Sequence, residues 1–180
     1  MTFSQKQFFS NPKIKTVAIA CLALLLGVVL YILDRPHDRV YFLDEWFEKE
    51  GMLDNQSDGL GQYFGNLGQY LPTFLHTYAF ILLTMVVVFP HKKFKKNIIW
   101  ICLFWFILES LFEVAQIDAI ANSLAQGFPT AFNNIPFIEN IPNYFIYGTF
   151  DVLDLVSIAV GASFAYLTIY FITQEECSNE

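Results

Sequence analysis

Two glutamates stand inside a run of apolar residues, where an ionisable side chain needs a reason to be present. Glu109 and Glu113 are four residues apart, and Gln116 follows three residues later. This spacing places all three side chains on one face of a helix. A carboxylate at the centre of a membrane helix costs about 2.5–3.5 kcal/mol on insertion scales, so we expect this face to point into a bundle.

Further polar residues occupy the ends of neighbouring apolar runs. His76 and Tyr78 lie in the first part of one run, and Asp151 and Asp154 lie at the start of the last run. If the runs are helices of alternating direction, these ends share one level of the bundle. The predicted layer contains His76, Tyr78, Glu113, Gln116, Asp151 and Asp154, with Glu109 beneath it.

Such a layer could perform two kinds of chemistry. Two carboxylates in a medium of low dielectric repel each other, so at least one should hold a proton near neutral pH, as proton relays and general acids do. Carboxylates together with an imidazole can also ligate a divalent metal. Because no helix carries a His-x-x-x-His or Glu-x-x-His spacing, the sequence specifies no metal site and no cofactor.

The same residues also admit a purely structural interpretation. Asp151 and Asp154 resemble a helix N-cap followed by an acid in the first turn, where the helix dipole favours negative charge. Thr149 could cap the helix equally well. Glu109 and Gln116 could hydrogen-bond to neighbouring helices, as polar residues in membrane bundles do. The pattern leaves both interpretations open.

A stripe of small residues follows on the last run, where Ser157, Gly161 and Ala165 recur every four residues. Such a stripe lets another helix approach closely. It contains no Gly-x-Ser-x-Gly nucleophile motif. The residue sets typical of intramembrane hydrolases are also missing, which leaves open whether the protein is an enzyme.

The elements that must position these residues are long apolar runs. Hydrophobic residues make up 55% of the 180 residues and charged residues 15%, against about 45–50% and about 25% in average soluble domains. Crossing a bilayer takes about 20 apolar residues in a helix. The sequence therefore predicts an all-α membrane protein, a single transmembrane domain over residues 1–180, with four helices at about 16–33, 73–90, 98–116 and 152–173.

The distribution of lysines predicts the orientation of these helices. Lys6, Lys13 and Lys15 precede the first run, and the link at 91–97 carries four more lysines. The connection at 117–151 has no Lys or Arg. Because basic flanks stay in the cytoplasm, we expect both termini on the cytoplasmic side. The first run lacks a cleavage site and predicts an uncleaved anchor helix.

The two outer connections show weaker patterns. Residues 40–52 place aromatic side chains at helical spacing between acids, which predicts a short amphipathic helix at the outer interface. The Gly-rich segment 58–68 indicates a flexible turn, and the segment 117–151 indicates ordered turns. Nucleic acid is excluded as a partner because no basic run alternates with aromatic residues.

Three short motifs resemble the VanZ-like family of small bacterial membrane proteins, named after a teicoplanin resistance factor. The segment 74–78 (Phe-Leu-His-Thr-Tyr) is similar to the family's His-x-x-Tyr-like helix opening, and Glu113 with Gln116 matches its Glu-x-x-Gln. Asp154 and Gly161 match its Asp-to-Gly spacing, although Ala165 stands where a second Gly is usual. The resemblance covers roughly residues 73–170. It implies a role at the cell envelope, in the bacterial cytoplasmic (inner) membrane, but no reaction.

Two hypotheses about function follow. The first is a VanZ-like envelope protein whose outer polar layer binds a lipid-linked or cell-wall-related ligand, or a proton. The second is a non-catalytic accessory subunit whose helices and outer loops bind a larger membrane protein complex. In both, the lipid bilayer surrounds the chain.

Overall fold

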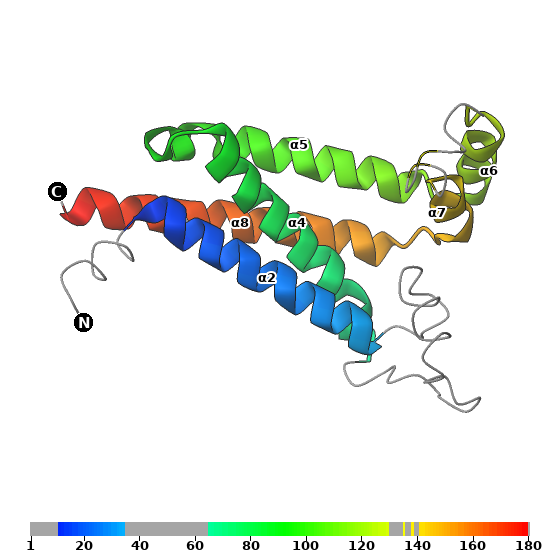
Figure 1. The fold of residues 1–180 in the computed structure, drawn as a ribbon, viewed down its shortest axis with the longest axis horizontal. Coiled ribbons are helices and arrows are strands. Elements are labelled where there is room, and N and C mark those ends of the chain that lie inside the picture. The colour runs from blue at the N-terminus through cyan, green and yellow to red at the C-terminus, as the bar shows by residue number, and fades with distance from the viewer. Residues whose placement is uncertain (1–10, 35–64, 130–134, 136–137, 139–140, 180) are drawn as a thin grey trace.

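The computed structural model describes residues 11–34, 65–129, 135, 138 and 141–179, and every regular element in these ranges is a helix (Figure 1). Four of the helices are long and apolar enough to cross a membrane, which confirms the predicted all-α architecture with four spans. Even the shortest of them has 21 residues, about 31 Å at about 1.5 Å per residue. The four helices are α2 (Pro12–Asp34), α4 (Asn66–Val88), α5 (Phe94–Val114) and α8 (Val152–Asn179).

Local sequence explains where several of these helices begin and end. The side chain of Asn11 accepts a hydrogen bond from the Lys13 amide at 3.0 Å, while Pro12 occupies the first helical position of α2, where no amide is needed. Gly65, before α4, has a φ of 54°, a conformation that suits glycine. α4 ends at Val88 because Pro90 disfavours helical geometry in the residue before it.

Three helices start earlier than the apolar windows suggested. α2 and α5 begin at Pro12 and Phe94 rather than at 16 and 98, because their first turns include lysines that can reach water from a helix end. α4 begins at Asn66 rather than at 73. Its first two turns contain glycine and polar residues, which a search for unbroken apolar runs excludes.

The connection between α5 and α8 also differs from the prediction. Instead of turns alone it contains two short helices, α6 (Asp118–Gln126) and α7 (Ile141–Tyr147), which pack against each other. The predicted amphipathic helix at 40–52 and most of the Gly-rich segment at 58–68 lie outside the described residues.

The bundle has two chemically distinct ends (Figure 1). At the first, which we call the lysine end, lie the start of α2, the end of α8 and the short 3-10 helix η2 (His91–Lys93) that links α4 to α5. The ammonium group of Lys13 donates to the carbonyl of Val86 at 3.1 Å there, tying α2 to α4. At the opposite end, which we call the acidic end, lie the start of α4, the end of α5, the pair α6 and α7, and the start of α8.

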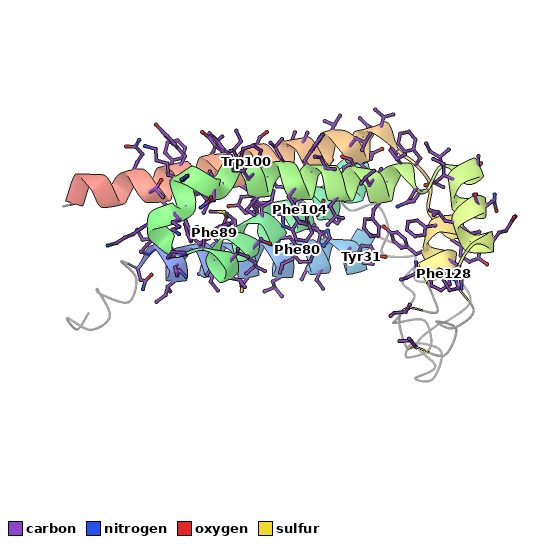
Figure 2. The ribbon with its side chains drawn as sticks, turned by 90° about the horizontal axis from the view of Figure 1, so that it is seen from above. Tyr31, Phe80, Phe89, Trp100, Phe104 and Phe128 are labelled. Atoms are coloured by element: carbon purple, nitrogen blue, oxygen red, sulfur yellow. The ribbon has the colours of Figure 1, made fainter. Side chains whose placement is uncertain are left out.

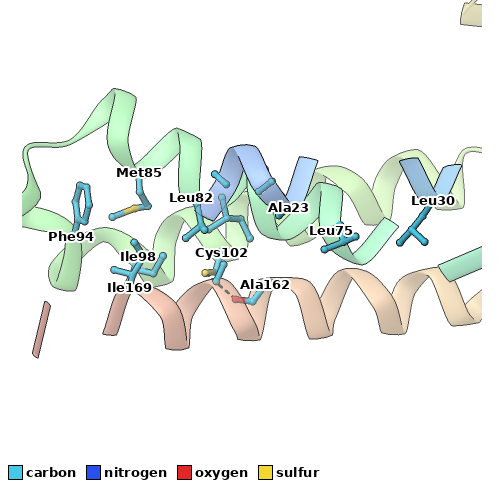
Figure 3. Close-up of a cluster of buried hydrophobic side chains, with 14 residues drawn as sticks. Ala23, Leu30, Leu75, Leu82, Met85, Phe94, Ile98, Cys102, Ala162 and Ile169 are labelled. Atoms are coloured by element: carbon cyan, nitrogen blue, oxygen red, sulfur yellow. Dashed lines mark hydrogen bonds between the residues drawn. The ribbon is translucent and has the colours of Figure 1, made fainter. Parts of the chain in front are cut away.

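The core lies around α4, which contacts α2, α5 and α8. Its fully buried side chains Ile81, Leu82 and Met85 meet Ile169 of α8 and Phe94 of α5 (Figure 3). Cys102 is also buried in this cluster, with its Sγ 3.4 Å from the carbonyl of Ala162 (Figure 3). It therefore packs as a small hydrophobe.

The outer surface of the four helices is apolar (Figure 2). Trp100 is 68% exposed and Leu22 is 67% exposed, and large aliphatic and aromatic side chains project from α5 along most of its length. A soluble monomer rarely exposes apolar patches of this extent. The surface fits lipid as the surrounding medium.

Candidate functional site

The first turn of α8 is held by a carboxylate from α5. Asp151 precedes α8, and its Oδ1 accepts the amide hydrogen of Leu153 at 2.8 Å, so Asp151 is the N-cap. The amide of Asp151 itself donates to Oε1 of Glu113 at 2.7 Å. Glu113 is only 8% exposed. The end of α5 and the start of α8 are thereby joined at one point.

Two hydroxyl groups of α4 complete the arrangement. The hydroxyl of Tyr70 donates to Oδ2 of Asp151 at 2.9 Å, and the hydroxyl of Thr73 donates to Oδ1 of Asp154 at 2.8 Å. Both aspartates also interact electrostatically with Glu113. We call these five residues the acidic cluster; it consists of Tyr70, Thr73, Glu113, Asp151 and Asp154.

The electrostatics of the acidic cluster are unbalanced within the described residues. Its three carboxylates are stabilised by two hydroxyls, by backbone amides and by the positive end of the α8 dipole. All six lysines in the described part of the chain belong to the lysine end or to the first turn of α2. The acidic cluster therefore favours a ligand that supplies positive charge, protons or hydrogen-bond donors.

A second polar group lies further along α4 and α5. The hydroxyl of Thr77 contacts Oε2 of Glu109 and also lies 3.0 Å from the carbonyl of Thr73. Oε1 of Glu109 is buried without a hydrogen-bond partner, 3.7 Å from Nδ1 of His76. One hydroxyl proton of Thr77 is shared between these two acceptors, and a proton on Glu109 that is donated to Thr77 would relieve this competition.

His76 connects this second group to the surface of the bundle. Its side chain is 49% exposed, whereas that of Glu109 is 12% exposed. Its ring also packs edge-on against Phe80, with 4.0 Å between the ring centroids. His76 therefore lies between the buried Glu109 and the outside of the helices.

Two predicted site residues have different surroundings. The hydroxyl of Tyr78 lies 3.0 Å from that of Thr168 on α8, away from the acidic cluster. Gln116 follows the end of α5 and donates through Nε2 to the hydroxyl of Tyr144 on α7 at 3.2 Å. Its side chain also packs against Gly148, where an added Cβ would lie 2.6 Å from the Gln116 Cδ. Gln116 thus positions the segment that leads into α8.

The small-residue stripe of α8 faces α4. A Cβ added to Gly161 would lie 2.7 Å from the carbonyl oxygen of Phe74, so only glycine fits at this crossing. Ala165, one turn further on, is fully buried, and Ser157 is half-buried. The close approach of α4 and α8 brings Thr73 within reach of Asp154.

The sequence pattern missed three hydroxyl residues of the site. Tyr70, Thr73 and Thr77 all lie on α4 and bind Asp151, Asp154 and Glu109 respectively. Their spacing of three and then four residues places them on one helix face. This signal was present in the sequence, but two of the three residues stand at or before the start of the apolar run.

Among the described residues, no group of three or more His, Cys, Asp or Glu side chains has an arrangement that could hold a metal ion. The fold and the acidic cluster define the class of protein: an all-helical, multi-pass membrane protein with a buried glutamate and two half-buried aspartates at one end of its bundle. No protein-family model, curated protein or solved structure matches the chain.

Proposed function

We propose that the chain is a VanZ-like protein of the bacterial cell envelope whose acidic cluster binds the head of a lipid-linked or cell-wall-related ligand. The observation that carries the proposal is the meeting of Glu113, Asp151 and Asp154 with Tyr70 and Thr73. Each of these acids opposes insertion into lipid. Two of the motifs that resemble the family, at Glu113 and at Asp154, contribute to this one cluster.

The chemistry of the cluster narrows the ligand class. Carboxylates accept hydrogen bonds, so they suit hydroxyl or ammonium groups such as those of sugars and amino acids. They repel phosphate, so a lipid-linked ligand would present its sugar or peptide part to the cluster. Aromatic rings of α5 and α7 lie at the same end, where Phe112 and Phe145 stack at 5.9 Å and Tyr144 packs edge-on against Phe145. Such rings suit the apolar faces of sugars.

The orientation of the bundle supports the outer leaflet as the place of binding. Four lysines lie in the α4–α5 link and the first turn of α5, whereas the described part of the acidic end has neither Lys nor Arg. Basic flanks are retained in the cytoplasm. The lysine end and both termini then face the cytoplasm, and the acidic cluster faces outward.

A proton is the alternative ligand, favoured by the Glu109 group. Thr77 contacts Oε2 of this carboxyl, and His76 lies 3.7 Å from Oε1, which is buried without a hydrogen-bond partner, so a protonated form would reduce the cost of its burial. Such a group can exchange a proton with the surface through the half-exposed imidazole of His76. In this case Glu109, rather than Asp154, is the residue on which activity depends most strongly.

Complementation of a deletion strain tests the proposal. Wild type, Glu113→Gln and Asp154→Asn are compared for teicoplanin susceptibility and for accumulation in the membrane by immunoblotting. Thr173→Val is the control, because the Thr173 hydroxyl donates only to carbonyls of its own helix at the other end of α8. We expect both acid variants to accumulate and to lose the phenotype, and the control to retain it. Loss of accumulation in both acid variants would instead indicate a structural role.

The ligand itself can be sought in detergent-purified protein. Bound molecules are extracted and compared by liquid chromatography and mass spectrometry between wild type and Asp154→Asn. The expected result is a hydroxyl- or amine-rich species that is present with wild type and with Thr173→Val and depleted from Asp154→Asn. Equal amounts in all three proteins would contradict binding at the acidic cluster.

The second candidate function is an accessory subunit, and the outer face of α5 favours it. α5 is the least buried of the four spans, and its exposed side chains include large aromatic rings (Figure 2). These are Trp100, Phe104, Phe106 and Phe112. Purification in a mild detergent followed by mass spectrometry of the whole sample tests this function. A single species without a stoichiometric partner would count against it.

A further inference from the structure

The start of α5 carries positive charge where a helix favours negative charge. Lys92 and Lys93 belong to η2, Lys95 and Lys96 belong to the first turn of α5, and all four are exposed. That turn contains no acid, and Lys93 at the N-cap position makes no side-chain capping bond. Because a helix N-terminus is the positive end of its dipole, these lysines oppose the dipole. An anion bound here would compensate both the charge of the lysines and the positive end of the helix dipole.

The described residues supply no such anion. No carboxylate whose side chain the structure describes, which leaves out Glu175 and Glu176, forms an ion pair with any of these four lysines. Lys95 reaches toward the ring of Tyr170 on α8, with its Nζ 6.0 Å from the ring centroid. Lys92, Lys93 and Lys96 have exposed side chains that can contact an external partner. In the sequence, Glu175 and Glu176 follow near the end of α8, and substitution of both tests whether they compete for the lysines.

The surface next to the lysines is strongly apolar. Val87, at the end of α4, is 81% exposed, and Trp100 on α5 is 68% exposed (Figure 2). Trp100 lies four residues after Lys96 and therefore on the same helix face. Tryptophan is enriched at the level of the lipid headgroups. A ligand at this place would meet basic groups at one end and apolar groups at the other, as a phospholipid does.

We infer that the α4–α5 link is a binding site for an anionic phospholipid, whose phosphate contacts Lys92, Lys93 and Lys96 and whose acyl chain lies along Trp100. Clusters of Lys and Arg next to the cytoplasmic end of a membrane helix attract anionic lipid headgroups. Free phosphate would use only the lysines, so the exposed apolar flank distinguishes the two ligands. The site lies at the opposite end from the acidic cluster and does not depend on the proposed function.

Native mass spectrometry of the full chain tests the inference with phosphatidylglycerol as the anionic probe and phosphatidylcholine as the neutral one. Wild type should retain phosphatidylglycerol more strongly. Each lysine should contribute about fivefold to the affinity, from about 1 kcal/mol per basic residue near an anionic surface. The variant Lys92→Gln/Lys93→Gln/Lys96→Gln should then bind about a hundredfold more weakly. Equal retention of the two lipids by wild type would overturn the inference.

Two single variants provide matched controls for the lysines. Lys96→Gln and Lys49→Gln change the net charge equally, but Lys49 belongs to the sequence segment between α2 and α4 and not to the link. Only Lys96→Gln should weaken phosphatidylglycerol binding, and Lys96→Arg should preserve it. Equal weakening by Lys96→Gln and Lys49→Gln would show a general charge effect and contradict a local site. Circular dichroism and gel filtration confirm that each variant is folded.

Trp100→Ala and inorganic phosphate separate a lipid site from a simple anion site. Trp100→Ala should weaken the binding of phosphatidylglycerol severalfold, and excess inorganic phosphate should displace little of the lipid from wild type. Displacement by inorganic phosphate at the same concentration as the lipid would overturn the assignment to a phospholipid. Glu175→Gln/Glu176→Gln should leave lipid binding unchanged or strengthen it, and weaker binding in that variant would also contradict the inference.

Discussion

The carboxylate of Glu113 accepts a hydrogen bond from the backbone amide of Asp151 at 2.7 Å. This contact joins the end of α5 to the N-cap of α8 across 38 positions of the sequence. It gives one structural reason for a glutamate within a membrane span, because the amide of a cap residue otherwise needs another acceptor. The same contact holds Asp151 where Tyr70 can reach it.

Glu113→Ala should therefore destabilise the bundle more than Glu113→Gln. Alanine leaves the buried amide of Asp151 without an acceptor, at a cost of about 1–3 kcal/mol, whereas the amide oxygen of glutamine can still accept. Thermal unfolding in detergent, followed by tryptophan fluorescence, measures the difference. Equal unfolding temperatures for the two variants would contradict the structural importance of this contact.

Thr73 and Asp154 should be energetically coupled. A double-mutant cycle of Thr73→Val and Asp154→Asn is expected to give a coupling energy of about 0.6 kcal/mol and at most about 1.7 kcal/mol, the range for hydrogen bonds between membrane helices. The matched cycle of Thr173→Val with Asp154→Asn should give none, since Thr173 donates only within α8. Equal coupling in the two cycles would exclude a specific bond between Thr73 and Asp154.

Gly161→Ala should separate α4 from α8. The added Cβ would lie 2.7 Å from the Phe74 carbonyl oxygen and 3.1 Å from the Thr77 Cβ, so a backbone must move. Overpacking of this kind typically costs about 1–3 kcal/mol. Gly27→Ala is the control, because its Cβ would lie 3.4 Å from the Leu75 Cβ, an ordinary contact. Thermal unfolding should show a large loss for Gly161→Ala and a small one for Gly27→Ala.

The architecture could be predicted from the sequence because each span is a long apolar run. The meeting of Glu113 with Asp151 followed from depth alone, since Glu113 lies near the end of one apolar run and Asp151 at the start of another, at the same side of the bundle. Depth does not specify the direction in which a side chain points. His76 and Tyr78 are two residues apart and cannot share a helix face, and the structure shows Tyr78 bonded to Thr168 instead.

The remaining differences arise where polar residues extend an apolar helix. Tyr70 was not foreseen in the site because the run of apolar residues starts after it, although the helix starts at Asn66. The partner of Gln116 could not be predicted from the sequence either. Tyr144 belongs to α7, a short helix that packs against α6. Contacts of this kind require the tertiary structure.

Glu109→Met should retain the stability of the protein. Thr77 would keep the carbonyl of Thr73 as its acceptor, and His76 is half-exposed, so neither is left unsatisfied. Replacing a poorly bonded buried polar group by an apolar one of similar size can be neutral or stabilising. The variant should also lose an infrared C=O band of a protonated carboxyl. A lower unfolding temperature, or an unchanged infrared spectrum, would contradict this account of Glu109.

Cysteine labelling should locate the acidic end outside the cell. On a background in which Cys21 and Cys177 are serine and Cys102 is alanine, Ser123→Cys on α6 and Lys92→Cys on η2 introduce single exposed thiols at opposite ends of the bundle. Because lysine-rich links stay in the cytoplasm, a membrane-impermeant maleimide should label the first in intact cells and the second only after permeabilisation. The reverse pattern would place the acidic cluster at the cytoplasmic face, where an outer-leaflet ligand could not reach it.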